Sequence, residues 1–288
     1  MTIKQIAKIS GCQDGAIWQN LLFRFDHSGK FCVYALTDIK ADAVEELEPL
    51  GRFVLDKADI IVPHSNAVFW GTEYFAPDDE YPILYSNIYN NYAGAEDKLI
   101  GVCCAYRVER TGKSFKTTLV QLIEIGFTED PLLWKAHPDR HGVRPYGNFV
   151  IDRQDGYYYA FVMRDEDLGT RYFKFRIPSL NEGELDPTYG VKRVVLTPDD
   201  ICDKFDCPYH RFIQGAALHG GKIYSTEGFC NSEDNRPAIR VIDLDGKKEE
   251  QYIDLWEMGY KLEPEMIDFY DDICYYSDAD GNLYRLEL

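Results

Sequence analysis

The sequence predicts an all-β fold, a five-bladed β-propeller, and two observations lead to that prediction. First, apolar and polar residues alternate along most of the chain, whereas long runs with helical periodicity are scarce. Second, a short strand-like motif with an aromatic residue at its centre recurs five times, at intervals of 52 to 74 residues. Such intervals suit one four-stranded sheet per copy and a radial assembly of the sheets. The five copies are Leu22-Phe23-Arg24, Leu84-Tyr85-Ser86, Tyr158-Tyr159-Ala160, Ile223-Tyr224-Ser225 and Tyr275-Tyr276-Ser277.

Each of the first four copies lies within a stretch long enough for four strands. Turn signals such as His27-Ser28-Gly29-Lys30 and Asp245-Gly246 separate the expected strands. The first blade is expected to use strands at 16–18, 21–26, 31–36 and 52–55, and the second strands at 66–70, 83–89, 99–108 and 117–125. The third blade is predicted over 148–196 and the fourth over 215–255, and the best helical candidates are short, at 41–48 and 198–204.

The last copy has room for three strands only, at 266–269, 273–277 and 283–288. We expect the strand at 3–9 to supply the fourth, because pairing the two ends of the chain in one blade removes two open sheet edges. A further copy hidden between residues 100 and 135 would instead make the ring six-bladed.

Composition limits the class of partner. The chain has 288 residues, of which 45% are hydrophobic, and we expect one propeller domain over 1–288. A net charge of −18 argues against nucleic acid and anionic membrane surfaces as partners. Neither an export signal nor a long apolar run is visible, so a cytoplasmic location is expected. The eight cysteines are irregularly spaced, and Cys103 and Cys104 should face opposite sides of one strand, so free thiols are expected.

In a propeller, the innermost strands line the central channel, so the residues that open each repeat should gather there. All five openings are polar in this chain, which predicts a ligand pocket on the axis. The candidate lining residues are Asp14, Gln19, His64, Asn66, Arg144, Tyr146, Asn148, Gln214, Glu263 and Glu265.

Glu263 and Glu265 are the candidate catalytic residues, because they flank a proline that fixes the backbone between them. Two carboxylates held in this way could share a proton, bind a divalent metal ion in the channel together with His64, or accept hydrogen bonds from sugar hydroxyls. Arg144 is the natural counter-charge, and an ion pair of Glu265 with Arg144 that merely plugs the channel is the structural alternative.

Two groups of propellers resemble parts of the chain. The segments Phe212-Ile213-Gln214-Gly215 and Ile223-Tyr224-Ser225-Thr226-Glu227-Gly228 resemble a repeat of glutaminyl cyclase propellers, although Glu227 follows the threonine instead of preceding the serine. The openings His64-Ser65-Asn66, Gln214-Gly215 and Glu263-Pro264-Glu265 are similar to those of bacterial propellers of the helveticin and phage receptor-binding-head type. These resemblances imply the fold and a polar channel. Five-bladed furanosidases are similar in architecture, which would make Asp14 and Glu265 a candidate acid pair.

Three functions follow as hypotheses. The leading one is binding of a small polar ligand, most plausibly a carbohydrate, in the axial channel. The second is a hydrolase or cyclase in which Glu265 or Glu263 serves as acid or base, with or without a metal ion. The third is a scaffold for protein interactions that uses the exposed rim.

Overall fold

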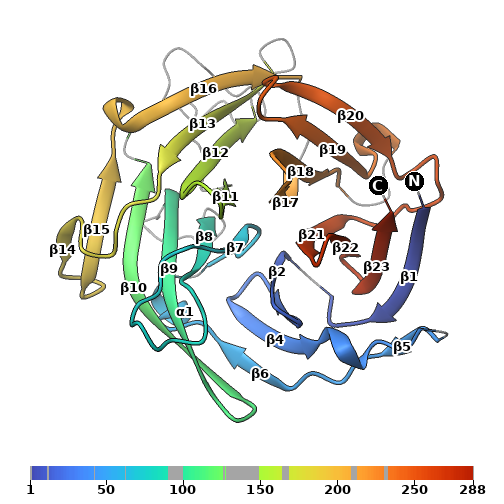
Figure 1. Cartoon of the computed structure of the whole chain (residues 1–288), viewed down its shortest axis with the longest axis horizontal. Helices are drawn as coiled ribbons and strands as arrows, with labels where there is room; N and C mark the ends of the chain where they lie inside the picture. Colours follow the sequence, from blue (N-terminus) through green and yellow to red (C-terminus); the bar gives the residue numbers. More distant parts are fainter. Residues whose placement is uncertain are drawn as a thin grey trace.

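The computed structural model describes residues 2–11, 13–41, 43–61, 63–89, 100–125, 127, 149–163, 169–208, 213–229 and 233–287. Five sheets stand around a central axis, which confirms the five-bladed propeller (Figure 1). The innermost strands of the successive blades are β2 (Gly15–Trp18), β7 (Val68–Trp70), β11 (Phe149–Asp152), β17 (Ile213–His219) and β21 (Pro264–Tyr270).

Outside the innermost strands, blades 1, 3 and 4 each add three antiparallel strands. Blade 1 adds β3 (Leu21–Phe25), β4 (Lys30–Ala35) and β6 (Gly51–Val54). Blade 3 adds β12 (Tyr157–Met163), β13 (Thr170–Arg176) and β16 (Ile201–Cys207), and blade 4 adds β18 (Lys222–Glu227), β19 (Ala238–Asp243) and β20 (Lys248–Asp254). The described helices are short: α1 (Ala58–Ile61) and 3-10 turns at Leu36–Asp38, Pro198–Asp200 and Glu233–Asn235. None of the described helices has the length and apolar character that a membrane span needs.

The recurring aromatic residue occupies one structural position in all five blades. It lies on the second strand and pairs with the innermost strand, as in Phe23 opposite Ala16 and Tyr224 opposite Ala217. The other three pairs are Tyr85 with Phe69, Tyr159 with Val150 and Tyr276 with Ile267. The sequence motif is therefore a structural repeat, and positions can be compared between blades.

The first strand of the chain closes the ring, as predicted. β1 (Thr2–Lys8) pairs antiparallel with β23 (Asn282–Glu287), which follows β22 (Ile273–Asp278) in blade 5. The two termini therefore lie next to each other (Figure 1). A short parallel pairing with β5 (Glu45–Glu46) covers the outer edge of β1.

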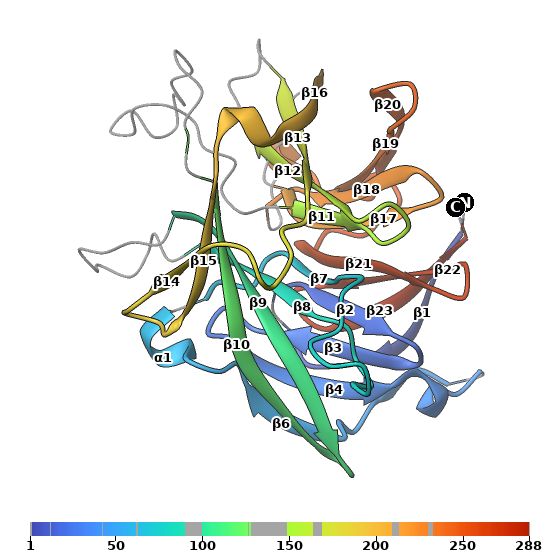
Figure 2. The same cartoon turned by 60° about the vertical axis from the view of Figure 1, so that its left-hand side comes forward.

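Blade 2 is larger than predicted. After β8 (Leu84–Tyr89) it contains the long hairpin of β9 (Ile100–Thr111) and β10 (Ser114–Ile125), so residues 100–125 of the segment in which a sixth blade was considered belong to this blade. β15 (Val191–Leu196) then pairs in parallel with β10, and β14 (Glu184–Asp186) follows outside it (Figure 2). Arg193 on β15 holds this extension, since it lies 2.9 Å from Glu124 and 2.7 Å from Asp186.

Three expectations about blade 3 and the helices were wrong in detail. Blade 3 does not end at residue 196, because the last strand of the predicted range joins blade 2 and β16 completes blade 3. The helix predicted at 198–204 is a single 3-10 turn, fixed by the capping box of Thr197 and Asp200, and the backbone then extends into β16. The described residues within 41–48 contain β5 and no helix.

The apolar core lies between neighbouring blades, because each sheet buries both of its faces. Cys103 and Cys104 illustrate this arrangement, since Cys103 packs in the cluster shared by blades 2, 3 and 4, and Cys104 in the cluster shared by blades 1 and 2. This confirms that the two side chains face opposite ways. The cysteines at the six described positions all carry free thiols.

Candidate functional site

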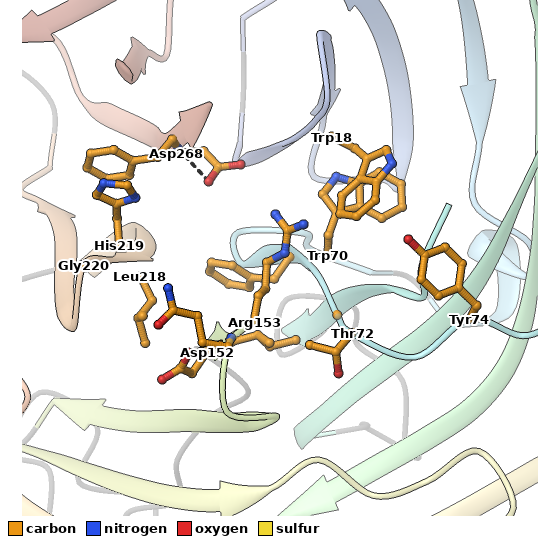
Figure 3. A pocket seen from close by; sticks show the side chains of 15 residues that line it. Trp18, Trp70, Thr72, Tyr74, Asp152, Arg153, Leu218, His219, Gly220 and Asp268 are labelled. Carbon is orange, nitrogen blue, oxygen red and sulfur yellow. Dashed lines mark hydrogen bonds between the residues drawn. The ribbon is translucent and has the colours of Figure 1, made fainter. Parts of the chain in front are cut away.

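A pocket on the propeller axis, called the axial pocket below, lies where the innermost strands end. Its volume is about 400 Å³, and residues at or just beyond the ends of β2, β7, β11, β17 and β21 line it, so all five blades contribute (Figure 3). The lining residues that carry the argument below are Trp18, Trp70, Tyr74, Arg153, His219 and Asp268. Trp18 of blade 1 and Asp268 of blade 5 both line the pocket, so the pocket forms only when the ring is closed.

Aromatic rings form one wall of the pocket. The rings of Trp18 and Trp70 lie 5.9 Å apart, and Trp70 is fixed from behind by Phe23 at 5.0 Å and Tyr81 at 5.7 Å. Tyr74 stands further out, with 42% of its surface exposed. The indole nitrogens of both tryptophans are buried, and no described residue accepts a hydrogen bond from either. The wall therefore offers a ligand the partly exposed rings of Trp18 and Tyr74, whereas Trp70 packs behind them.

Asp268 is one of two carboxyl groups that line the pocket, and backbone donors hold it. Its Oδ2 accepts a hydrogen bond from the backbone N–H of Ile17 at 2.6 Å, and its Oδ1 accepts one from the N–H of Phe269 at 2.8 Å. The first bond joins blade 5 to blade 1, where the free edge of β2 would otherwise leave this N–H unsatisfied. Burial raises the pKa of Asp268 to about 6, although the two backbone donors and the charge of Arg153 act in the opposite direction.

Arg153 brings a positive charge to the pocket from the hairpin after β11. The side chain of Asp152 shapes this turn, because its Oδ1 accepts the backbone N–H of Gln154 at 2.9 Å. The guanidinium of Arg153 lies 4.5 Å from the centre of the Trp18 ring and points into the middle of the pocket (Figure 3). Burial lowers the pKa of Arg153, although the nearby charge of Asp268 acts to raise it. No described residue accepts a hydrogen bond from this guanidinium.

His219 forms the wall opposite the tryptophans. Its ring stacks on Phe269 at 4.3 Å and almost parallel, at 5°, while its Nε2 lies 3.3 Å from Oδ1 of the exposed Asp272. The imidazole is thus oriented by an aromatic ring on one side and a carboxylate on the other.

A second polar cluster lies at the other end of the innermost strands. Asp14, Arg24 and Glu265 are at most 3% exposed, and the charge of Arg24 lowers the pKa of both carboxyl groups. Burial outweighs this effect, so it raises the pKa of Glu265 to about 8 and places that of Asp14 well above its ordinary value. Asp14 Oδ2 accepts the N–H of Val68 at 2.9 Å, whereas Asp14 Oδ1 and Glu265 Oε2 have no partner among the described residues.

Arg24 breaks the repeat. It follows the shared aromatic residue of blade 1, at a position that is fully buried in all five blades. The other four blades carry small residues there: Ser86, Ala160, Ser225 and Ser277. A buried guanidinium at this single position supplies the positive charge for the two axial carboxyl groups, with its Nη2 3.4 Å from the carbonyl oxygen of Asp278.

The residues predicted from the repeat openings occupy several places. Asp14, Gly215 and Glu265 converge, because a Cβ atom on Gly215 would lie 3.2 Å from Asp14 Oδ1 and 2.5 Å from the carbonyl oxygen of Glu265. Gln214 donates from Nε2 to Oε1 of Glu263 at 2.6 Å. None of these residues lines the axial pocket.

The remaining predicted residues are more scattered. Asn66 accepts a hydrogen bond from the Asn87 side chain, and burial together with the charge of His27 lowers the pKa of His64 to about 4. Gln19 is exposed in the turn after β2, with a positive φ of 54°. The predictions for Arg144, Tyr146 and Asn148 lie outside the described residues. Within the described chain, no group of three or more His, Cys, Asp or Glu side chains is placed to hold a metal ion.

Sequence reasoning missed the pocket residues because it considered the openings of the repeats and not the ends of the innermost strands. A positional signal was present. The residues two places beyond the innermost-strand partner of each shared aromatic residue all line the pocket: Trp18, Gly71, Asp152, His219 and Phe269. Arg24 was also visible, since it stands inside the recurring motif itself.

Comparisons with known proteins identify no family for this chain. No protein-family model matches the chain, and no curated protein sequence matches it. Among solved structures, the glutaminyl cyclase of Myxococcus xanthus is 10% identical over 98% of this chain and 97% of its own, with a TM-score of 0.48. A glucose dehydrogenase is 12% identical over the full length of both chains, with a TM-score of 0.48. A tail fiber of a Staphylococcus aureus phage is 11% identical over 99% of this chain and 52% of its own, with a TM-score of 0.41. The class that the fold defines is the β-propeller, and at these identities nothing more specific follows.

Proposed function

We propose that this propeller binds a saccharide in the pocket at the ends of its innermost strands. The observation that carries the proposal is the combination, in one pocket of about 400 Å³, of aromatic rings, a carboxylate held by two backbone donors, and an arginine. Sugars present apolar C–H faces that pack on aromatic rings and hydroxyl groups that need both donors and acceptors. The volume falls in the range of small-molecule sites.

Tyr74 provides the test that least disturbs the fold, because its ring is exposed at the pocket mouth. We expect Tyr74→Ala to weaken saccharide binding about three- to tenfold through loss of one aromatic contact. Binding would be found with a thermal-shift screen of mono- and oligosaccharides and then measured by isothermal titration calorimetry. Tyr252→Ala is the matched control, because Tyr252 is also 42% exposed but lies on the outer strand β20. Equal affinities for the two variants would contradict the proposed site.

Catalysis remains the second candidate, and one observation favours it. Glu265 is buried, its Oε2 has no partner among the described residues, and its pKa of about 8 keeps it protonated at neutral pH, as a general acid requires. Glu265→Gln separates the two functions, since acid catalysis should fall by roughly a hundredfold or more, whereas binding should change little. A scaffold that uses the rim would leave both measurements unchanged.

A further inference from the structure

We infer that the saccharide carries a carboxylate, which pairs with the guanidinium of Arg153 in the axial pocket. This inference rests on the proposed function, and it names the chemical class of the sugar: a uronic acid or another monoanionic acidic sugar.

The first argument is the state of the guanidinium. Seven other arginines of the described chain pair with carboxylates: Arg107, Arg110, Arg171, Arg176, Arg193, Arg236 and Arg240. With 49 acidic residues against 31 basic ones, carboxylates are abundant in this chain. Arg153 nevertheless donates no hydrogen bond to any described residue. Its donors are therefore available to a ligand that enters the pocket.

The second argument is the way in which Arg153 is held. The Trp18 ring supports one face of the guanidinium, and the Asp152 turn fixes the backbone below it, so little freedom is lost when an anion binds. The neighbouring carboxylate of Asp268 is oriented by two backbone N–H groups, and it influences the pKa of Arg153 through its charge without forming an ion pair with it. A planar guanidinium can then offer two parallel donors to a carboxylate.

The third argument is the amount of charge. Arg153 is the only lysine or arginine among the described lining residues, and Asp152 and Asp268 stand close to it. One guanidinium can balance one negative charge of a ligand. A dianionic phosphate would be attracted more strongly by Arg153, but it would also be repelled more strongly by the two carboxyl groups and would keep one charge without a partner. We therefore expect a carboxylate and not a phosphate ester.

The test compares sugars that differ only in charge. Isothermal titration at fixed ionic strength would use glucuronate against glucuronamide, then glucuronate, galacturonate and mannuronate against their parent aldoses, and finally glucose 6-phosphate. We expect at least one uronate to bind about tenfold or more tightly than its neutral counterpart, since charge-assisted hydrogen bonds are the strong ones. Arg153→Gln should remove this ratio, because it weakens binding of the uronate more than binding of the neutral sugar. Arg153→Lys should restore part of it.

Arg176→Gln is the matched control, because it also removes one exposed arginine of blade 3 but lies outside the pocket. It should leave the ratio unchanged. Equal binding of charged and neutral sugars, or a ratio that survives in Arg153→Gln, would overturn the inference and leave the proposed function intact. Tighter binding of glucose 6-phosphate than of any uronate would overturn the charge argument. Failure of every neutral and acidic sugar to bind would overturn both proposals together.

Discussion

At the scale of single residues, Arg24 shows how a repeat acquires a specific electrostatic centre. Four blades bury a serine or an alanine at this position, and these small residues need no charged partner. Arg24 is tolerated because it interacts electrostatically with two carboxyl groups from other segments, and its charge acts to lower the pKa of both Asp14 and Glu265. A buried charge of this kind stabilises only as part of its cluster.

Replacing Arg24 tests this interpretation. We expect Arg24→Ser, which copies the residue of three other blades, to reduce the free energy of unfolding by about 2–5 kcal/mol, because it removes a large buried side chain together with the charge that opposes the rise of the Glu265 and Asp14 pKa values. Denaturant unfolding at pH 7 measures the change. Ser277→Ala, at the equivalent position of blade 5, is the control and should cost no more than about 1 kcal/mol. A loss for Arg24→Ser as small as that of the control would show that neither the packing nor the charge of Arg24 contributes substantially to stability.

Glu265 predicts a pH dependence of stability. Its pKa rises from 4.5 to about 8 on folding, first through burial and also through Glu263 and Asp278, while Arg24 opposes the rise. Above pH 4.5 the unfolded chain releases this proton and the folded chain retains it, so stability falls as the pH rises toward 8. Glu265→Gln should remove most of this fall. Between pH 4 and pH 8, the free energy of unfolding of the wild type should decrease by about 2–4 kcal/mol more than that of the variant.

Unfolding curves of the wild type and the variant between pH 4 and 9 measure this difference. Glu48→Gln, a change at an exposed glutamate, is the control and should follow the wild type. Parallel curves for Glu265→Gln and the wild type would mean that Glu265 is not protonated in the folded protein at neutral pH.

At the scale of elements, strands were predictable and their partners were less so. Alternation located most strands to within two residues, because it reflects which side chains face a neighbouring blade. The alternation does not show which strand an outer strand pairs with. This is why β15 was assigned to blade 3, although its Arg193 pairs with Glu124 of β10 in blade 2. Local composition also favoured a helix at 198–204, whereas the structure has one turn of 3-10 helix at Pro198–Asp200 followed by β16.

The closing strand gives the prediction at this scale. Without residues 2–8, the edge of β23 would lose its partner, and an exposed edge promotes aggregation. We expect the truncated chain to lose solubility and thermal stability, and a peptide of residues 2–9 added in trans to restore part of both. Light scattering and thermal unfolding measure the effect. A peptide with the same composition in scrambled order is the control, and equal rescue by both peptides would contradict the role of β1.

At the scale of the whole molecule, the number of blades was predictable and the position of the pocket was not. The five aromatic residues mark one position per blade, so the ring could be counted from the sequence. The sequence also indicated an axial site, but of the described repeat openings only Asp14, Gly215 and Glu265 converge, and they form the buried cluster. Which end of the axis forms a pocket depends on how the strand ends and hairpins of five blades pack together, and no single repeat contains that information.

The construction of the pocket from strand ends has an evolutionary consequence. Each blade contributes side chains at or near the end of its innermost strand. Trp18, Arg153, His219 and Asp268 come from four different blades, so a substitution in one blade changes one part of the pocket. The sheets thus form a constant framework, and substitutions at the strand ends of one blade can change the ligand without changing the fold.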